Sequence, residues 1–136
     1  NDIAYDEKFI KKYKLKKTTF ENALKYCDII TFHVPFTNLT CNMVNNENIK
    51  FLRKNTIVIN TSRGSVIDVV NLSKKIIEKN LRIAIDVYKK EPLRLKKTLL
   101  KIKESIFTPH IGGTTIESKL RIGRKNISDL SNFFKK

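Results

Sequence analysis

Short runs of apolar, mostly β-branched residues alternate along this chain with longer stretches of helical spacing, and this alternation limits the possible folds most. The run 56–60 is almost continuously apolar, as expected for a strand covered on both faces of a sheet. Comparable strand-like runs and helical stretches follow one another at 18–26, 28–32, 46–52, 56–60, 69–79, 83–87, 106–108 and 114–134. Such alternation predicts an α/β fold with a parallel sheet and right-handed crossovers.

The first twenty residues are less regular. We expect Ile3–Tyr5 to be the tail of a strand that ends at Asp6, and residues 8–17 to form a basic loop. Thr18 and Glu21 stand three residues apart, which is the spacing of a capping box. We therefore expect a short helix to begin at this pair.

Composition excludes several classes of protein. The chain has 136 residues, of which 40% are hydrophobic, and this share favours a packed core over a disordered chain. No apolar run approaches the roughly 18 residues of a membrane helix, and the first residues do not resemble a secretory signal. Cys27 and Cys41 are too few for a disulfide scaffold. We expect a soluble protein from a reducing, cytoplasm-like compartment, without a metal site.

The charge is strongly positive, with 28 Lys and Arg against 13 Asp and Glu and a net +15. A basic chain can bind nucleic acid. Lysine supplies most of the charge and is spread along the whole chain, whereas arginine, the better reader of bases and phosphates, is scarce. A lysine-rich nucleic-acid-binding module is therefore an alternative, and it predicts an affinity that falls steeply with salt.

The rare residues gather behind the predicted strands. The chain has four Gly, three Pro and two His. All Pro, both His and three Gly follow an expected strand: His33, Pro35, Gly64, Pro92, Pro109, His110, Gly112 and Gly113. Ligands of open parallel sheets bind at the carboxyl ends of the strands, so these positions are the candidate site.

Four phrases stand at these strand ends: His-Val-Pro at 33–35, Asn-Thr-Ser-Arg-Gly at 60–64, Asp-Val-Tyr-Lys-Lys-Glu-Pro at 86–92 and Thr-Pro-His-Ile-Gly-Gly at 108–113. In this order they resemble the D-isomer-specific 2-hydroxyacid dehydrogenases, and the resemblance runs from Ile3 to the end of the chain. It implies an incomplete Rossmann-type parallel sheet, from the second strand onward. It also implies a partial NAD-binding domain at 1–113, and a terminal helix at 114–136 that lies at the edge of that domain or returns to a substrate domain.

The resemblance implies a catalytic trio. Arg63 would bind the substrate carboxylate with its fork of donors and polarise the keto oxygen. His110 would be the general acid that protonates this oxygen and takes the proton back in reverse. Glu91 would favour the imidazolium form of His110 and fix its orientation. From local signals alone, these residues also fit a surface arginine, a structural loop histidine and a solvated glutamate beside Lys89 and Lys90.

The resemblance also implies cofactor contacts. Asp6 would accept hydrogen bonds from the adenosine ribose and repel a 2′-phosphate, which favours NAD over NADP. Locally, Asp6 fits a turn residue equally well. Asp86 resembles the residue that meets the nicotinamide carboxamide, and His33 and Pro35 resemble those beside the adenosine half.

The nicotinamide end would be approached by Thr61 and Ser62, while Gly112 and Gly113 would allow close backbone contact. No GxGxxG phosphate loop occurs in the sequence, and the central first strand of a Rossmann sheet is missing too. We interpret the chain as a piece of a longer polypeptide, with a decayed remnant as the alternative.

The expected reaction is reversible hydride transfer between NADH and a 2-keto acid, a small-molecule substrate. The segment 112–114 resembles the branch of the family that acts on 3-phosphoglycerate in serine biosynthesis, and a basic chain suits a phosphorylated substrate. The alternative is a non-catalytic NAD-sensing relative, similar to the corepressors of this fold. The resemblance also suggests a homodimer, and neither a membrane nor nucleic acid is an expected partner.

Overall fold

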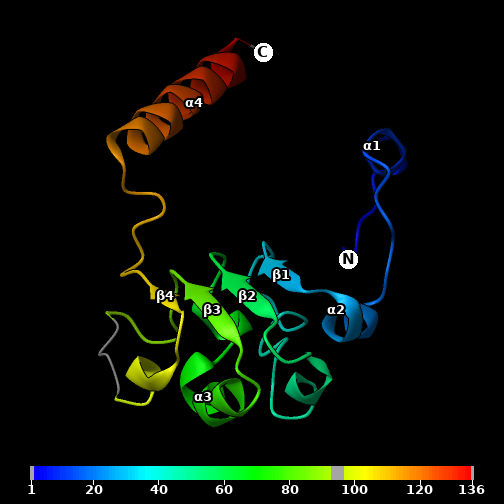
Figure 1. Cartoon of the computed structure of the whole chain (residues 1–136). Coiled ribbons are helices and arrows are strands. Elements are labelled where there is room, and N and C mark those ends of the chain that lie inside the picture. The colour runs from blue at the N-terminus through cyan, green and yellow to red at the C-terminus, as the bar shows by residue number, and fades with distance from the viewer. Residues whose placement is uncertain (1, 93–96, 136) are drawn as a thin grey trace.

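A four-stranded parallel sheet lies at the centre of the computed structural model, which describes residues 2–92 and 97–135 (Figure 1). The strands lie side by side in chain order: β1 (Ile29–Phe32), β2 (Ile57–Asn60), β3 (Arg82–Ile85) and β4 (Ile106–Phe107). Val58 stands opposite Ile30 on one side and Ile83 on the other. The predicted α/β fold with a parallel sheet is confirmed, and all four strands end at the same edge.

Helices connect and flank these strands: α1 (Glu7–Lys12), α2 (Phe20–Tyr26), α3 (Val69–Glu78), α4 (Ile116–Phe134) and three short 3₁₀ helices at Ile49–Phe51, Gly64–Val66 and Leu99–Lys101. The crossover helix α3 begins at Asp68, whose carboxylate accepts a hydrogen bond from the Asn71 N–H at 3.2 Å. This cap satisfies one of the free N–H groups of the first turn.

The hydrophobic core lies between the sheet and α3, which runs along one face of the sheet (Figure 1). Every second residue of β2 and β3 is buried, as the period of a strand requires. Leu72 and Ile76 of α3 pack in the same cluster as Val58 and Ile83. β1 is covered less well, since Ile29 is 58% exposed. The sheet and α3 thus form a framework that holds the strand ends in place.

The expected strand at Ile3–Tyr5 is wrong. These residues pair with none of the described strands, and Ile3 is 94% exposed. A strand needs a neighbour that takes up its backbone hydrogen bonds, and the described chain offers none there. The four described strands are therefore adjacent, without the gap that a strand at 3–5 would imply.

The basic loop expected at 8–17 is partly helical. Asp6 caps α1 by accepting a hydrogen bond from the Phe9 N–H at 3.0 Å, with Glu7 in the first turn and Lys11 and Lys12 in the last. This charge order favours a helix through its dipole.

Two helix starts also differ from expectation. The N-cap of α2 is Thr19, which accepts from the Asn22 N–H at 3.2 Å, one residue after the expected Thr18. The helix expected at 46–52 shortens to a 3₁₀ helix at Ile49–Phe51. Both features depend on which of two neighbouring positions turns first, and sequence spacing does not decide this.

Candidate active site

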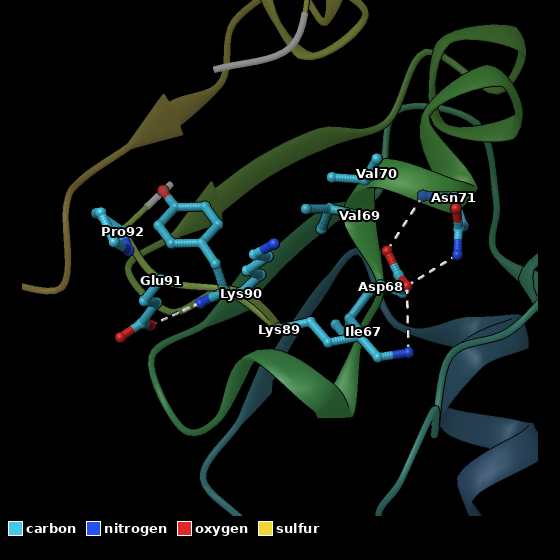
Figure 2. Close-up of a pocket in the computed structure, with 10 residues that line it drawn as sticks. Ile67, Asp68, Val69, Val70, Asn71, Lys89, Lys90, Glu91 and Pro92 are labelled. Carbon is cyan, nitrogen blue, oxygen red and sulfur yellow. Dashed lines mark hydrogen bonds and ion pairs between the residues drawn. The ribbon is translucent and has the colours of Figure 1, made fainter. Parts of the chain in front are cut away.

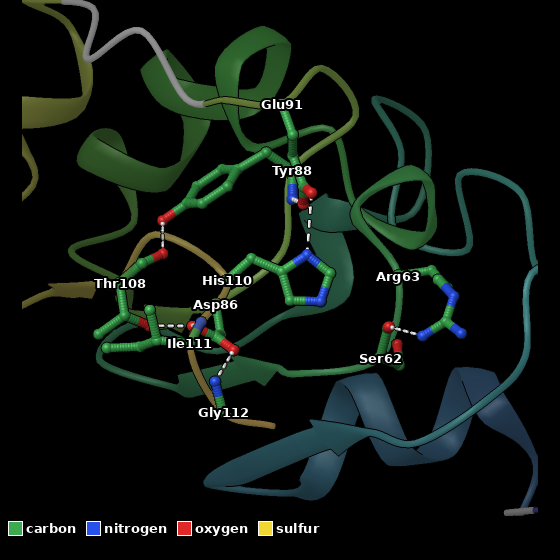
Figure 3. Close-up of polar contacts among 9 residues, drawn as sticks. All are labelled: Ser62, Arg63, Asp86, Tyr88, Glu91, Thr108, His110, Ile111 and Gly112. Atoms are coloured by element: carbon green, nitrogen blue, oxygen red, sulfur yellow. Dashed lines mark hydrogen bonds and ion pairs between the residues drawn. The ribbon is translucent and has the colours of Figure 1, made fainter. Parts of the chain in front are cut away.

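The loops that follow β2, β3 and β4 lie at the carboxyl edge of the sheet and carry polar side chains there (Figure 3). Ser62 and Arg63 follow β2, and Asp86 follows β3 directly. Glu91 lies further along the loop after β3, and His110 lies on the loop after β4. Parallel strands bring their carboxyl ends to one edge, so residues of different loops, such as Glu91 and His110, lie in contact.

Glu91 and His110 form a direct pair. The Glu91 Oε2 lies 2.8 Å from the His110 Nδ1 (Figure 3). The hydrogen bond with His110, together with one from the Tyr88 N–H, holds the pKa of Glu91 below its usual value. The carboxylate is therefore ionised near neutral pH and only accepts, so Nδ1 must be the donor. The other ring nitrogen, Nε2, is left for proton exchange with a ligand.

The backbone at His110 is unusual. Its φ angle is +58°, in the left-handed region that non-glycine residues rarely adopt. Such a conformation persists only where surrounding contacts impose it, and it is frequent at functional sites. The neighbours of His110 in sequence supply these contacts through Asp86.

Asp86 clamps the loop that carries His110. Its Oδ1 accepts hydrogen bonds from the Thr108 hydroxyl at 2.5 Å and the Ile111 N–H at 2.9 Å, and its Oδ2 accepts from the Gly112 N–H at 2.9 Å. Burial by itself raises the pKa of Asp86, but these hydrogen bonds and the nearby His110 outweigh it, so that the pKa lies below its usual value. The carboxylate stays charged and holds the loop from both sides of His110.

Arg63 sits on a turn built by a buried asparagine. Asn60 is fully buried; its side-chain amide donates to the Arg63 carbonyl at 3.0 Å, and its Oδ1 accepts from the Ser62 N–H and hydroxyl. The Arg63 guanidinium donates from Nη1 to the Ser62 carbonyl at 2.7 Å. Within the described chain it makes no hydrogen bond to Glu91 or His110 and lies apart from the pair (Figure 3). Its other N–H groups are available to an anion.

The residues expected around the adenosine half are not drawn into this cluster. The Asp6 carboxylate caps α1, and the His33 Nε2 lies 2.9 Å from the Thr31 hydroxyl oxygen. The carbonyl of Pro35 accepts from the Thr40 hydroxyl at 2.6 Å. Each of the three residues thus has a partner within the chain, Asp6 and His33 through the side chain and Pro35 through the backbone carbonyl. Their contact with a cofactor stays a prediction.

The residues expected near the nicotinamide end also differ from one another in their surroundings. Thr61 is exposed and Ser62 is buried against Asn60. At Gly112 a Cβ would come within 2.9 Å of the Asp86 Oδ2, so a side chain there would press on the clamp. At Gly113 a Cβ would meet no described atom within 4 Å. Close packing against Asp86 therefore explains why position 112 is a glycine, but it does not explain the glycine at position 113.

Two contributors escaped the sequence analysis. Tyr88 donates its N–H to the Glu91 Oε1 and its hydroxyl to the Thr108 carbonyl, and Asn60 builds the Arg63 turn. Both stand inside the four phrases: Tyr88 lies between Asp86 and Glu91, and Asn60 comes just before Thr61. For Asn60, a polar residue at the end of a buried strand was the available signal.

A cavity of about 540 Å³ adjoins the pair on the side of α3 (Figure 2). Asp68, Val69 and Val70 line one side of it, and Lys90 and Glu91 line the other. The Lys89 ammonium lies 3.7 Å from the Asp68 carboxylate and bridges the two sides. In the described residues, no group of three His, Cys, Asp or Glu side chains is placed to hold a metal ion. Nor is any helix in that part of the chain both long and apolar enough to cross a membrane.

Known proteins are similar to this chain in sequence and in fold. Residues 2–112 match the family described as D-isomer specific 2-hydroxyacid dehydrogenase, NAD binding domain. The chain therefore belongs to the D-isomer specific 2-hydroxyacid dehydrogenase family, as the resemblance predicted.

Individual relatives cover nearly the whole chain. D-3-phosphoglycerate dehydrogenase of Archaeoglobus fulgidus is 33% identical over an alignment of 141 positions, which covers 99% of this chain and 27% of the relative. Glyoxylate reductase of Thermococcus litoralis is 40% identical over 101 residues, 74% of this chain and 30% of the relative. D-lactate dehydrogenase from Aquifex aeolicus, complexed with NAD and lactic acid, has a TM-score of 0.79 at 29% identity, over 98% of this chain and 45% of that one. This chain spans less than half the length of each.

The matched domain is one that binds NAD, so NAD is the cofactor of this family. The described residues fit it at the strand ends. The Asp86 Oδ2 accepts one N–H and keeps acceptor capacity for an amide donor, and the surroundings of Gly113 are open. The 136 residues contain no GxGxxG loop, so they do not themselves supply that cradle for a pyrophosphate.

Proposed function

We propose that this chain forms the NAD-binding and catalytic part of a dehydrogenase that interconverts a D-2-hydroxy acid and its 2-keto acid. The observation that carries the proposal is the 2.8 Å contact between the Glu91 carboxylate and the His110 Nδ1 at the carboxyl edge of the sheet. The Arg63 guanidinium on the neighbouring loop donates from Nη1 to the Ser62 carbonyl and adds its other N–H groups as donors for an anion. A proton carrier and a carboxylate receptor on adjacent loops suit a 2-keto acid.

The chemistry follows from the free groups of the trio. NAD, when bound, supplies the hydride in one direction and accepts it in the other. His110 gives a proton from Nε2 to the carbonyl oxygen of the keto acid and takes it back from the hydroxyl in reverse. Glu91 holds the imidazole by Nδ1 and stabilises its charged form. Arg63 binds the substrate carboxylate and draws charge toward the keto oxygen.

The cofactor contacts are part of the proposal. Asp86 and the backbone at Gly112 and Gly113 would face the nicotinamide end, together with Thr61 and Ser62. The adenosine half would lie against Asp6, His33 and Pro35. Support for all of these residues except Asp6 comes from their positions after β1, β2, β3 and β4, where parallel sheets bind nucleotides. Asp6 precedes α1, and its contact rests on the resemblance alone.

For the substrate we propose 3-phosphoglycerate and its 2-keto acid, which would place the protein in serine biosynthesis in the cytoplasm. Support comes from D-3-phosphoglycerate dehydrogenase among the relatives and from Lys90, which lines the cavity beside Glu91 and supplies a positive charge. Glyoxylate reductase is among the relatives too, so the keto-acid panel below decides between these substrates. We further propose a homodimer, with residues 1–113 as the cofactor domain and 114–136 as its terminal helix.

Oxidation of NADH, followed by absorbance in the native protein, tests the function. The panel consists of 3-phosphohydroxypyruvate, hydroxypyruvate and glyoxylate. His110→Asn should lower kcat by about 10²–10⁴-fold, the usual contribution of a general acid, and leave NADH binding intact by fluorescence. Asp129→Asn is the control and should retain turnover, because Asp129 pairs with Lys125 on an exposed face of α4 and has no part in the proposed site.

Two results would contradict the proposal. Turnover by His110→Asn at the wild-type rate would remove His110 from the proton transfer. NADH binding by the native protein, without turnover of any keto acid, would favour a nucleotide-sensing role over the enzyme.

A further inference from the structure

Tyr88 lies where three loops of the site meet, and no part of the proposed mechanism uses it. It stands three residues beyond the end of β3 and is only 7% exposed. Its hydroxyl lies 2.8 Å from the Thr108 carbonyl and 3.0 Å from the Ile85 carbonyl (Figure 3). The single hydroxyl proton is shared between these two acceptors, which belong to the ends of β4 and β3.

The same residue also contacts Glu91. The Tyr88 N–H donates to the Glu91 Oε1 at 3.0 Å, which leaves Oε2 directed at the His110 Nδ1. One carboxylate oxygen is thus held by the backbone of Tyr88 while the other holds the imidazole. The orientation of Glu91 depends on where the Tyr88 backbone lies.

The Arg63 loop rests on the same peptide. A Cβ at Gly64 would lie 1.9 Å from the Tyr88 carbonyl carbon and 2.4 Å from the Lys89 nitrogen. The backbone next to Arg63 is therefore in direct contact with the Tyr88–Lys89 peptide. Only glycine permits this approach, because a Cβ would overlap backbone atoms that cannot rotate away.

We propose that Tyr88 is a positioning residue that sets the spacing among Arg63, Glu91 and His110. Its hydroxyl holds the loop of His110, its N–H holds Glu91, and its peptide supports the Arg63 turn. The catalytic meaning of this role rests on the proposed function, but the geometry does not.

The hydroxyl matters because the His110 loop is held in a conformation that it would otherwise leave. His110 has a φ of +58°, and Thr108, two residues earlier, is held through its carbonyl by Tyr88 and through its hydroxyl by Asp86. Without the Tyr88 hydroxyl, the Thr108 carbonyl loses this partner, and Thr108 keeps the Asp86 clamp and the bond from its N–H to the Ile85 carbonyl at 3.0 Å. The loop then relaxes toward ordinary backbone angles and draws the imidazole away from Glu91.

Tyr88→Phe tests this role, because it removes one oxygen and keeps the ring and the N–H. The matched control is Tyr26→Phe, at a side chain that is 72% exposed. The first readout is the tautomer of His110 from ¹⁵N NMR, which is simple because the chain has two histidines. The ratio of the tautomer protonated on Nδ1 to the tautomer protonated on Nε2 should fall by about fivefold. This change is comparable to the loss of one hydrogen bond. Tyr26→Phe should leave the ratio unchanged.

The second readout is kinetic. In the native protein, Tyr88→Phe should lower kcat by about tenfold, with KM within about twofold and a shifted pH profile, as expected for a misplaced general acid. A loss of folding stability alone would move neither the tautomer nor the pH profile of the folded fraction. If Tyr88→Phe fails to fold, 3-fluorotyrosine at position 88 keeps the hydroxyl and ionises at lower pH. The tautomer should then change as that phenol ionises.

The outcomes separate this proposal from the proposed function. An unchanged tautomer, pH profile and kcat in folded Tyr88→Phe overturns the positioning role and leaves the dehydrogenase intact. In the fluorotyrosine protein, a tautomer ratio of His110 that stays constant while the phenol at position 88 ionises also overturns the positioning role. A native protein without turnover, whose tautomer still responds to Tyr88→Phe, overturns the proposed function and keeps the positioning role.

Discussion

Helices α3 and α4 are both amphipathic, yet only one of them is buried. α3 has ten residues and buries Val69, Leu72, Ser73 and Ile76 against the sheet. α4 has 19 residues and buries only Ser118, although Leu120, Leu130 and Phe133 lie along it and are more than half exposed. In Figure 1, α4 extends away from the sheet. Amphipathic spacing therefore predicts that a helix forms, but not which surface covers it.

This contrast predicts that equal substitutions have unequal effects in the two regions. The largest effect is expected at Leu72 of α3, which is 2% exposed. Leu72→Ala removes buried methyl groups and leaves a cavity, so the free energy of unfolding should fall by about 2–5 kcal/mol. Urea titration followed by circular dichroism measures it.

Leu130→Ala in α4 is the matched control, because Leu130 is 58% exposed. Its effect on the same unfolding transition should stay within about 0.5 kcal/mol. A comparable fall in the free energy of unfolding for both variants would show that α4 is covered in solution. The two helices would then not differ in burial.

Glycine substitutions should have opposite signs in the two regions. Gly64→Ala places a Cβ 1.9 Å from the Tyr88 carbonyl carbon and should destabilise the sheet by about 1–3 kcal/mol or more through overpacking. Gly123→Ala in α4 meets no atom within 4 Å and should raise helix content, by about 0.5–1 kcal/mol of helix stability. The check is the unfolding midpoint for the first and helical ellipticity for the second. A tolerated alanine at Gly64 would contradict the close approach of the Arg63 loop.

The smallest expected effect is a change in the pH dependence of stability. The pKa of Asp86 is lowered in the folded protein, so the unfolded chain binds this proton more tightly. The resulting stability is present near neutral pH and is lost as pH falls below roughly 4–5. The exposed Glu91 has a lowered pKa as well and adds a weaker, screened contribution of the same sign.

Asp86→Asn should therefore flatten the decline of the urea midpoint between neutral and acidic pH. Asp129 of α4, which pairs with Lys125 at 2.5 Å on an exposed face, provides the control. Asp129→Asn should keep the wild-type slope. A slope that is lost in both variants, or in neither, would assign the acid sensitivity to other carboxylates.

Sequence reasoning predicted elements correctly where a periodic pattern extended over many residues or where a run was strongly apolar. β2 and α3 were expected at nearly their observed bounds, and α4 was too. The strand at Ile3–Tyr5 was wrong because a strand exists only with a partner, and partners are non-local. The start of α2 at Thr19 was missed by one residue, since Thr18 and Thr19 are equally good caps by type.

The candidate site was predictable in part. Arg63, Glu91 and His110 were found through a resemblance, because each residue type by itself also fits an ordinary surface position. The structure places Glu91 and His110 in contact and keeps Arg63 on a separate loop. Tyr88 was missed because its hydroxyl partners lie three and twenty residues away, and no local pattern links them.

By itself, the amino-acid sequence determined the four described strands, most of the helices, the parallel arrangement of the sheet and the set of reactive groups at the strand ends. These follow from local periodicity and from residue chemistry, which neighbouring positions carry. Only the tertiary structure decided that Glu91 touches His110, that Tyr88 joins their loops and that α3 is buried while α4 is exposed. Such contacts depend on the pairing of β3 with β4, which brings together residues that no local spacing relates.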